Sequence, residues 1–340
     1  MKVSVLGCGG WGLAVAVLLH NNGHQVSAWG RDSERFRQLQ ATRTSEKLLP
    51  GVTLHAEIQL TSDLTCVKDC DLVVLAVPSF AVADLAQSLQ PLLQPGQVLV
   101  LLSKGFDRNR GYCLLSDTVE QLLPRNPVVA LTGPSHAEEV ARGIPTAVLA
   151  ASADLAAAEL TQHAFMCESF RVYTSPDIVS AELGGAMKNI MAVAVGISDG
   201  YGYGDNTKAM LMTRGLTEIA RLGVAMGAHK DTFAGLTGVG DLIVTCVSNH
   251  SRNRRFGLLV GGGMAVEQAL EEVGAVVEGY FATRAVYALT QGKQVDMPIC
   301  NAMYRILVER APLDEVISAL LQRATRAEHD AYEAGELWNG

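Results

Sequence analysis

The 340-residue chain is predicted to fold as an α/β domain with a doubly wound sheet, followed by an all-α domain. Three observations predict this class. A glycine-rich motif lies between a strand pattern and a helix pattern near the amino terminus. Strand and helix patterns then alternate as far as Ser175, and only helical periodicity continues after Pro176. We therefore expect two domains, at residues 1–177 and 178–340.

The composition is that of a globular protein, with 49% hydrophobic and 18% charged residues. The net charge of -8 argues against broad nucleic-acid binding, because that requires a clustered basic surface; a local basic site for one small anion remains open. The amino terminus has no signal-peptide layout, and the long apolar segment at 181–198 is interrupted by Glu182 and Lys188. We expect a soluble, cytoplasmic protein without a membrane partner.

Cysteine and histidine usage is typical of a cytosolic protein without a dedicated metal site. The seven cysteines are scattered and contain no Cys-x-x-Cys pair, which fits reduced thiols. We expect lone histidines such as His136 and His229 to be structural or exposed.

The first predicted strand, residues 2–6, leads directly into the motif Gly7-Cys8-Gly9-Gly10-Trp11-Gly12 and then into a helix pattern. This is Gly-x-Gly-x-x-Gly in a Rossmann-like context. Gly7 permits the tight turn, Gly9 lets a pyrophosphate approach the backbone, and Gly12 allows the helix to pack closely on the strand. We predict a dinucleotide site here; the alternative is an ordinary glycine-rich turn.

The second predicted strand, residues 25–29, ends at Gly30-Arg31-Asp32. An acidic residue at this strand end usually holds the ribose 2′-hydroxyl of NADH, whereas an arginine accommodates the 2′-phosphate of NADPH. Arg31 therefore favours NADPH. Asp32 stands one or two positions late for the acidic role and could equally cap the next helix, so NADH remains a possible cofactor.

Three further buried strands, at 72–77, 98–102 and 128–131, end at residues suited to ligand binding. Pro78, Lys104 and the segment 133–135 follow them, and ligands of doubly wound sheets gather at the carboxyl ends of strands. The alternative for Lys104 is a solvated lysine in a turn. Two more strands, at 146–150 and 170–173, are predicted on either side of a helix at 154–166.

The segment 181–198 predicts a helix buried among other helices, and Lys188 is its unusual member. Burial disfavours a charged ammonium, so this lysine must find partners or lower its pKa, and a lysine of lowered pKa can transfer protons near neutral pH. The alternative is that Lys188 extends its charged end to solvent.

Two later segments could bind an anionic substrate. The glycine-rich stretch 235–241 can bring the carboxylate of Asp241 close to a ligand; Asp241 could also be a helix N-cap. Ser251-Arg252-Asn253 offers a hydroxyl, a guanidinium and an amide, a set suited to phosphate oxygens. The alternative for this basic run is a solvated face.

These pieces together closely resemble one family, the NAD(P)-dependent glycerol-3-phosphate dehydrogenases of bacterial type. The resemblance runs in order from residue 7 to about 280, and its motifs are 7–12, 76–79, 103–105, 133–137, 182–189, 238–241 and 251–253. The family often has serine where Gly10 stands. That departure removes one hydroxyl but keeps the backbone N–H groups.

The resemblance implies reversible interconversion of dihydroxyacetone phosphate and sn-glycerol 3-phosphate, which supplies the backbone of glycerophospholipids. It makes Lys188 the catalytic acid and base, with Lys104 and Asp241 beside it. The residues that it places around the substrate are Lys104, Gly133, Ser135, Lys188, Asp241, Ser251, Arg252 and Asn253. The resemblance also places residues at the cofactor. Within the glycine motif these include Gly10 and Trp11, and outside it they are Arg31, Lys104, Ala137, Arg252, Val276 and Glu278.

Two other classes of function stay open at this point. A different dehydrogenase, of the 3-hydroxyacid or ketopantoate type, could reuse the glycine motif and the lysine helix, but would not need Gly-Val-Gly-Asp followed by Ser-Arg-Asn. A dinucleotide-sensing protein without catalysis would not need Lys188 in an apolar helix. The helical half is a candidate for a homodimer interface.

Overall fold

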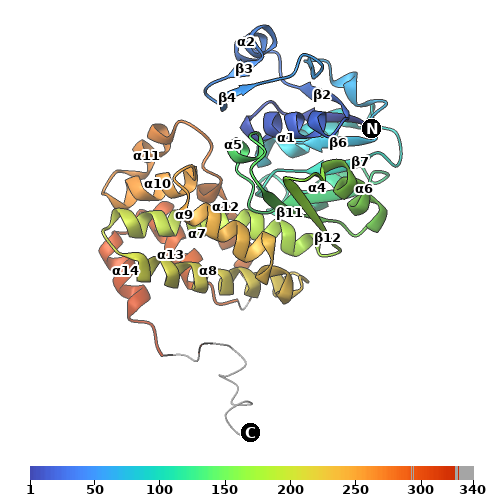
Figure 1. Cartoon of the computed structure of the whole chain (residues 1–340). Coiled ribbons are helices and arrows are strands. Elements are labelled where there is room, and N and C mark those ends of the chain that lie inside the picture. Colours follow the sequence, from blue (N-terminus) through green and yellow to red (C-terminus); the bar gives the residue numbers. More distant parts are fainter. Residues whose placement is uncertain (292, 294, 326–327, 329–340) are drawn as a thin grey trace.

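The computed structural model describes residues 1–291, 293, 295–325 and 328, and it places a twisted sheet beside a layer of helices (Figure 1). The sheet has eight strands in the order β12-β11-β10-β7-β6-β1-β2-β5, and β10 and β11 form its antiparallel pair. Its strands are β1 (Lys2–Leu6), β2 (Gln25–Trp29), β5 (Gln59–Thr61), β6 (Leu72–Leu75), β7 (Val98–Leu101), β10 (Val128–Thr132), β11 (Thr146–Ala151) and β12 (Phe170–Ser175).

Helices cover both faces of this sheet, and the apolar run of each central strand reflects that burial. One face packs on α1 and α6, the other on α3 and α4. The helices of this part are α1 (Gly10–Asn21), α2 (Glu34–Thr42), α3 (Val82–Leu89), α4 (Leu115–Leu122), α5 (Ala137–Val140) and α6 (Leu155–Phe165). Two short hairpins complete it, β3 (Thr44–Ser45) with β4 (Leu49–Thr53), and β8 (Phe106–Asp107) with β9 (Cys113–Leu114).

The predicted fold class is confirmed, and the predicted elements differ mainly at their ends. β6 stops at Leu75 instead of Val77, because Pro78 leads into a short 3₁₀ turn. The helix predicted at 154–166 is α6, and Asp154 is its N-cap, accepting a hydrogen bond from the amide of Ala157.

Most of the later helices pack around α7 (Ile178–Gly200), which is buried at every position from Ser180 to Ser198. By length and composition α7 could cross a membrane, but 89% of its apolar window is buried inside the protein, as in a core helix. The other helices are α8 (Asp205–Ala225), α9 (Asp241–Val247), α10 (Arg252–Gly261), α11 (Val266–Val273), α12 (Glu278–Thr290), α13 (Pro298–Leu307) and α14 (Leu313–Leu321).

Helices α7 and α10 touch backbone to backbone through glycines spaced four residues apart. A Cβ atom added at Gly196 would lie 2.1 Å from the carbonyl oxygen of Arg254, and one at Gly257 would lie 2.2 Å from that of Val193. Gly200 and Gly261 make equally close approaches one turn further on. The amino terminus of α10 is therefore held firmly against the helix that carries Lys188.

A second pair of glycines brings α7 against the carboxyl edge of the sheet. A Cβ atom at Gly184 would lie 2.5 Å from the carbonyl oxygen of Thr237, and one at Gly185 would lie 3.0 Å from Oγ1 of Thr132, at the end of β10. Thr237 belongs to a turn of π-helix, Leu236–Gly240, that leads into α9. Lys188, one turn along α7, thus lies where the sheet and the helical layer meet.

Candidate active site

The glycine motif forms an open cradle at the start of α1. Gly7 has a φ of +126°, and a Cβ atom at Gly12 would lie 1.9 Å from the carbonyl oxygen of Gly7. A Cβ atom at Gly9, by contrast, would meet nothing within 4 Å. The first amides of α1, which have no partner inside the helix, begin beside this open space. The cradle therefore fits a pyrophosphate, as the motif predicted.

Gly10 has a structural reason to lack a side chain in this protein. A Cβ atom there would lie 2.3 Å from the carbonyl oxygen of Leu48, in the β3–β4 hairpin, and 4.0 Å from Cβ of Ala137. Trp11 follows it in the first turn of α1 and is half-buried. A serine at this position would require the hairpin to shift.

The carboxyl end of β2 carries the residues expected to contact the 2′ position of the cofactor ribose. Arg31 is exposed there. Asp32 pairs with Arg37 at 3.1 Å, and the N-cap of α2 is Ser33, whose hydroxyl accepts from the amide of Phe36. The alternative role of Asp32 as the helix cap is therefore wrong, because Ser33 has the extended backbone that an N-cap needs.

Two lysines meet at one buried carboxylate. Oδ1 of Asp241 accepts from Nζ of Lys188, and Oδ2 accepts from Nζ of Lys104 at 2.8 Å. Lys188 also donates to Oγ1 of Thr245 at 2.7 Å. Asp241 is the first residue of α9 and Gly240 is the N-cap, so Asp241 is not the cap considered as an alternative. The three charges leave the cluster with an excess of positive charge.

Lys104, the second lysine of the cluster, is bound by the segment that follows β10. The carbonyl oxygen of Gly133 accepts from Nζ of Lys104 at 3.1 Å and from the hydroxyl of Ser135 at 3.0 Å. Gly133 has a φ of +141°, a backbone conformation that residues with side chains rarely adopt. Lys104, Gly133, Ser135, Asp241 and Lys188 thus form one continuous network.

The pKa of Lys188 is lowered to about 8: burial is the main cause, the charge of Asp241 opposes it, and the nearby charge of Lys104 lowers the pKa as well. The sequence leaves open whether Lys104 or Asp241 has the larger influence on this pKa. In the structure the charge of Asp241 acts more strongly than that of Lys104, and burial still keeps the pKa below its ordinary value. Glu182, another charged residue of this helix, accepts hydrogen bonds from Ser116, and burial raises its pKa to about 7.

The Ser251-Arg252-Asn253 motif forms the start of α10. Ser251 is the N-cap and accepts from the amide of Arg254, and Arg252 is exposed. The Asn253 amide donates to Oδ1 of Asn189 at 2.9 Å and accepts from the amide of Gly279 at 2.9 Å. Because Asn189 follows Lys188 in α7, these bonds tie the motif to the lysine helix, and they leave one N–H of Asn253 for a ligand.

Glu278 lies between the two layers, at the start of α12. The hydroxyl of Ser79, after β6, donates to its carboxylate at 2.9 Å. Burial raises the pKa of Glu278, against the lowering effect of the positive charges of Arg108 and Arg252. Val276 lies two residues earlier, in the connection before α12.

Several residues of the site were not singled out from the sequence. Thr245 lies four residues after Asp241, one helical turn along α9, so its position relative to Asp241 was the available signal. Asn189 and Thr237 gave no such signal. In the described part of the chain, Nε2 of His136 is buried without a hydrogen-bond partner, and burial lowers the pKa of this imidazole.

A dinucleotide cradle and a buried lysine of lowered pKa, both at the carboxyl edge of a mainly parallel sheet, define the class of nicotinamide-dependent dehydrogenases. The family models for the N-terminus and the C-terminus of NAD-dependent glycerol-3-phosphate dehydrogenase match residues 2–158 and 177–318. The chain belongs to this family.

Individual relatives agree with this assignment. The chain is 48% identical to glycerol-3-phosphate dehydrogenase [NAD(P)+] of Thermoanaerobacter sp. (strain X514), over 96% of this chain and 99% of the relative. The crystal structure of glycerol-3-phosphate dehydrogenase from Coxiella burnetii has a TM-score of 0.90 at 35% identity, with 95% of this chain and 99% of that chain covered. A ketopantoate reductase from Ralstonia eutropha shares the fold alone, at 16% identity and a TM-score of 0.61, with 95% of this chain and 100% of that chain covered.

Proposed function

We propose that this protein catalyses the reversible reduction of dihydroxyacetone phosphate to sn-glycerol 3-phosphate with NAD(P)H, the step that supplies the backbone of glycerophospholipids. The observation that carries this proposal is the buried Lys188–Asp241–Lys104 network at the edge of the dinucleotide sheet. The bound nicotinamide would supply the hydride that reduces the C2 carbonyl.

Lys188 is the proposed acid and base of this reaction. Its ammonium donates a proton to the C2 oxygen as the carbonyl is reduced, and its neutral amine takes that proton back when glycerol 3-phosphate is oxidised. Asp241 and Thr245 hold the ammonium in place. Lys104 adds positive charge beside the oxygen on which negative charge develops, in a site from which most water is excluded.

The proposed phosphate site is the amino terminus of α10. The guanidinium of Arg252 and the remaining N–H of Asn253 would bind phosphate oxygens there, together with the first amides of the helix. Ser251 already accepts a bond from the amide of Arg254, and its hydroxyl can still donate. Binding energy from the phosphate would hold the carbonyl near Lys188.

The test of the substrate is a comparison of NADPH oxidation with dihydroxyacetone phosphate, unphosphorylated dihydroxyacetone and ketopantoate. We expect turnover with the phosphorylated triose, and a kcat/KM for dihydroxyacetone lower by on the order of a thousandfold or more, because binding of the phosphate dianion is lost. Preference for ketopantoate would favour the other dehydrogenase class, and no turnover with any of the three would favour a binding protein.

We propose that NADPH is the preferred cofactor, supported by the exposed Arg31 at the end of β2. For Arg31→Ala we expect the ratio of NADPH to NADH affinity to fall by about tenfold, because one charge-assisted contact to the 2′-phosphate is removed. Fluorescence titration of both cofactors measures this ratio. The NADH affinity of the same variant is the internal control, and an unchanged ratio would contradict the role of Arg31.

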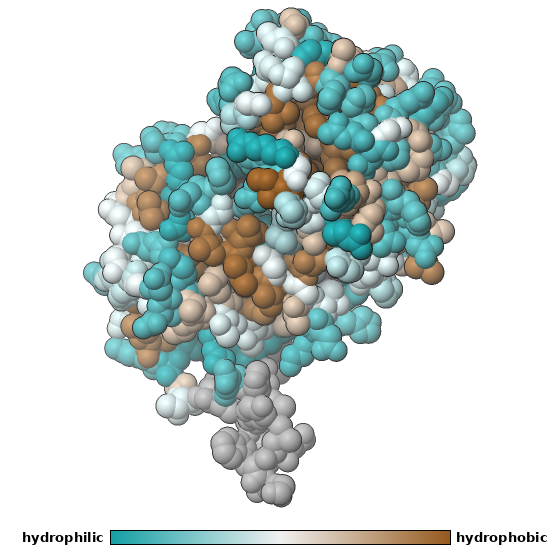
Figure 2. Space-filling view, in the orientation of Figure 1, coloured by the Kyte–Doolittle hydropathy of each residue, from teal (hydrophilic) through white to brown (hydrophobic). Residues whose placement is uncertain are grey.

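We also propose that residues 1–177 form the dinucleotide-binding domain and 178–340 the substrate domain, supported by the end of β12 at Ser175 and the start of α7 at Ile178. The protein would work in the cytoplasm as a homodimer. Exposed apolar side chains support self-association: Met210 and Val224 on α8, and Ile243 and Val247 on α9. Figure 2 shows hydrophobic side chains gathered on the front of the helical domain.

A further inference from the structure

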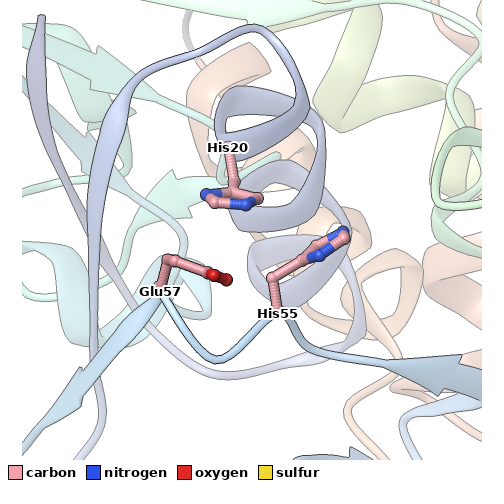
Figure 3. A group of neighbouring side chains, drawn as sticks. All are labelled: His20, His55 and Glu57. Carbon is pink, nitrogen blue, oxygen red and sulfur yellow. The ribbon is translucent and has the colours of Figure 1, made fainter.

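Two imidazoles and a carboxylate lie close together in the sheet domain (Figure 3). His20 lies in the last turn of α1, and His55 and Glu57 lie in the connection between β4 and β5. One ligand atom from each side chain lies within 4.8 Å of the other two, and the two imidazole rings have centroids 4.6 Å apart. None of the three has a role in the proposed reaction.

We propose that His20, His55 and Glu57 form a binding site for a divalent transition metal ion, with zinc as the ion that fits best. Two imidazole nitrogens and one carboxylate are a donor set that zinc accepts, with water in the fourth position. Ligand atoms around a tetrahedral ion with bonds of ~2.1 Å lie about 3.4 Å apart. The ligand atoms, now up to 4.8 Å apart, must therefore approach one another by up to about 1.4 Å, which the exposed His55 and Glu57 can do by rotation.

Other ligand combinations nearby are less suitable. The sequence does contain one His-x-x-x-His spacing, His20 with His24, which the expectation of no metal site overlooked. However, α1 ends at Asn21, and Nε2 of His24 lies 2.9 Å from the carbonyl oxygen of Ala164. Cys66 and Cys70 line the same cavity of about 690 Å³ as His20 and Glu57. Burial raises the pKa of both thiols, which disfavours the thiolate that a metal needs.

An ion at this site would link α1 to the connection between β4 and β5. Each of these segments leads to a part of the nucleotide cradle. His20 is near the end of the helix that begins at Gly10, and His55 lies shortly after the β3–β4 hairpin, whose Leu48 carbonyl approaches Gly10. Metal bound to the folded state alone would raise its stability in proportion to the logarithm of the metal concentration above Kd. The ion would thus stabilise the cradle through α1, by holding the end of that helix opposite to the cradle.

The test is isothermal titration of the full, tag-free chain with zinc chloride, in parallel with thermal unfolding. We expect one equivalent of zinc to bind with a micromolar Kd and to raise Tm by several degrees. In His55→Ala and Glu57→Gln the affinity should fall by at least about tenfold, and the rise in Tm should disappear. Both residues are exposed, so these variants should fold.

The matched control is His163→Ala, which removes an exposed histidine of α6 and should bind zinc as the unmodified protein does. Titration with cobalt(II) identifies the donor atoms, because a thiolate ligand produces an intense charge-transfer band that nitrogen and oxygen ligands lack. We expect no such band. Absence of zinc binding, equal binding by all variants, or a thiolate band that survives in His55→Ala would each overturn the proposal.

Discussion

Replacement of Lys188 by alanine should lower the turnover of dihydroxyacetone phosphate by on the order of a hundredfold or more, because the reaction loses its proposed acid. The variant should fold. Removal of one ammonium leaves Asp241 paired with Lys104, so the buried carboxylate keeps a partner of opposite charge. NADPH affinity should be largely unchanged, since the glycine cradle lies at the start of α1. Steady-state kinetics and fluorescence titration measure the two effects.

The pH profile gives this prediction a second readout. The pKa of Lys188 is lowered to about 8, so its ammonium predominates below that pH and its amine above it. Reduction requires the ammonium, and its kcat should therefore fall as pH rises through about 8; oxidation requires the amine, and its kcat should rise over the same range. Both dependences should vanish in Lys188→Ala.

Lys230→Ala is the control, because Lys230 is exposed on the helical domain outside the network. It should match the unmodified enzyme in turnover and in pH profile. A Lys188→Ala variant with unchanged turnover would refute the assignment of the proton-transfer residue. A large loss of turnover with an unchanged pH profile would show that another group supplies the proton.

Replacement of Arg252 by alanine should lower kcat/KM for dihydroxyacetone phosphate by on the order of a hundredfold, because a charge-assisted contact to the phosphate is lost. The activity toward unphosphorylated dihydroxyacetone should fall much less, since that substrate has no phosphate to bind and only a contact of Arg252 with the cofactor would affect it. The ratio of the two kcat/KM values therefore separates loss of the phosphate contact from general damage to the site.

Arg255→Ala is the matched control on the same helix. Arg255 is exposed, lies one turn further along α10, and pairs with Glu272 at 3.3 Å. Its removal should leave kcat/KM for both substrates within about twofold of the unmodified enzyme. Equal losses in Arg252→Ala and Arg255→Ala would point to the general positive field of this helix, and no loss in Arg252→Ala would remove it from the phosphate site.

Local patterns made much of the fold predictable from the sequence. At residues 2–21 the strand pattern, the glycine motif and the helix pattern follow directly in the sequence, so each supports the prediction of the next. The ends of the buried strands are predictable because polar residues begin there. The partners of Lys188 were harder to predict. Asp241 is 53 residues away in the chain, and only the packing of α7 against the π-helical turn brings the two together.

The energetic balance at the site also required the structure. The sequence indicates that burial and Lys104 should lower the pKa of Lys188 and that Asp241 should raise it, but their relative strength depends on distance and burial. Similarly, the cluster of His20, His55 and Glu57 combines a helix end with a loop more than thirty residues later, and no single spacing in the sequence reveals it.

The glycine contact between α7 and α10 fixes how the proposed phosphate site is placed relative to Lys188. Lys188 lies about two turns before Gly196, and Arg252 lies about one and a half turns before Gly257. Since peptide groups meet directly at this crossing, no side chain can repack to widen or narrow it. The helix crossing therefore fixes the separation between the proposed proton donor, Lys188, and the proposed phosphate site at Arg252.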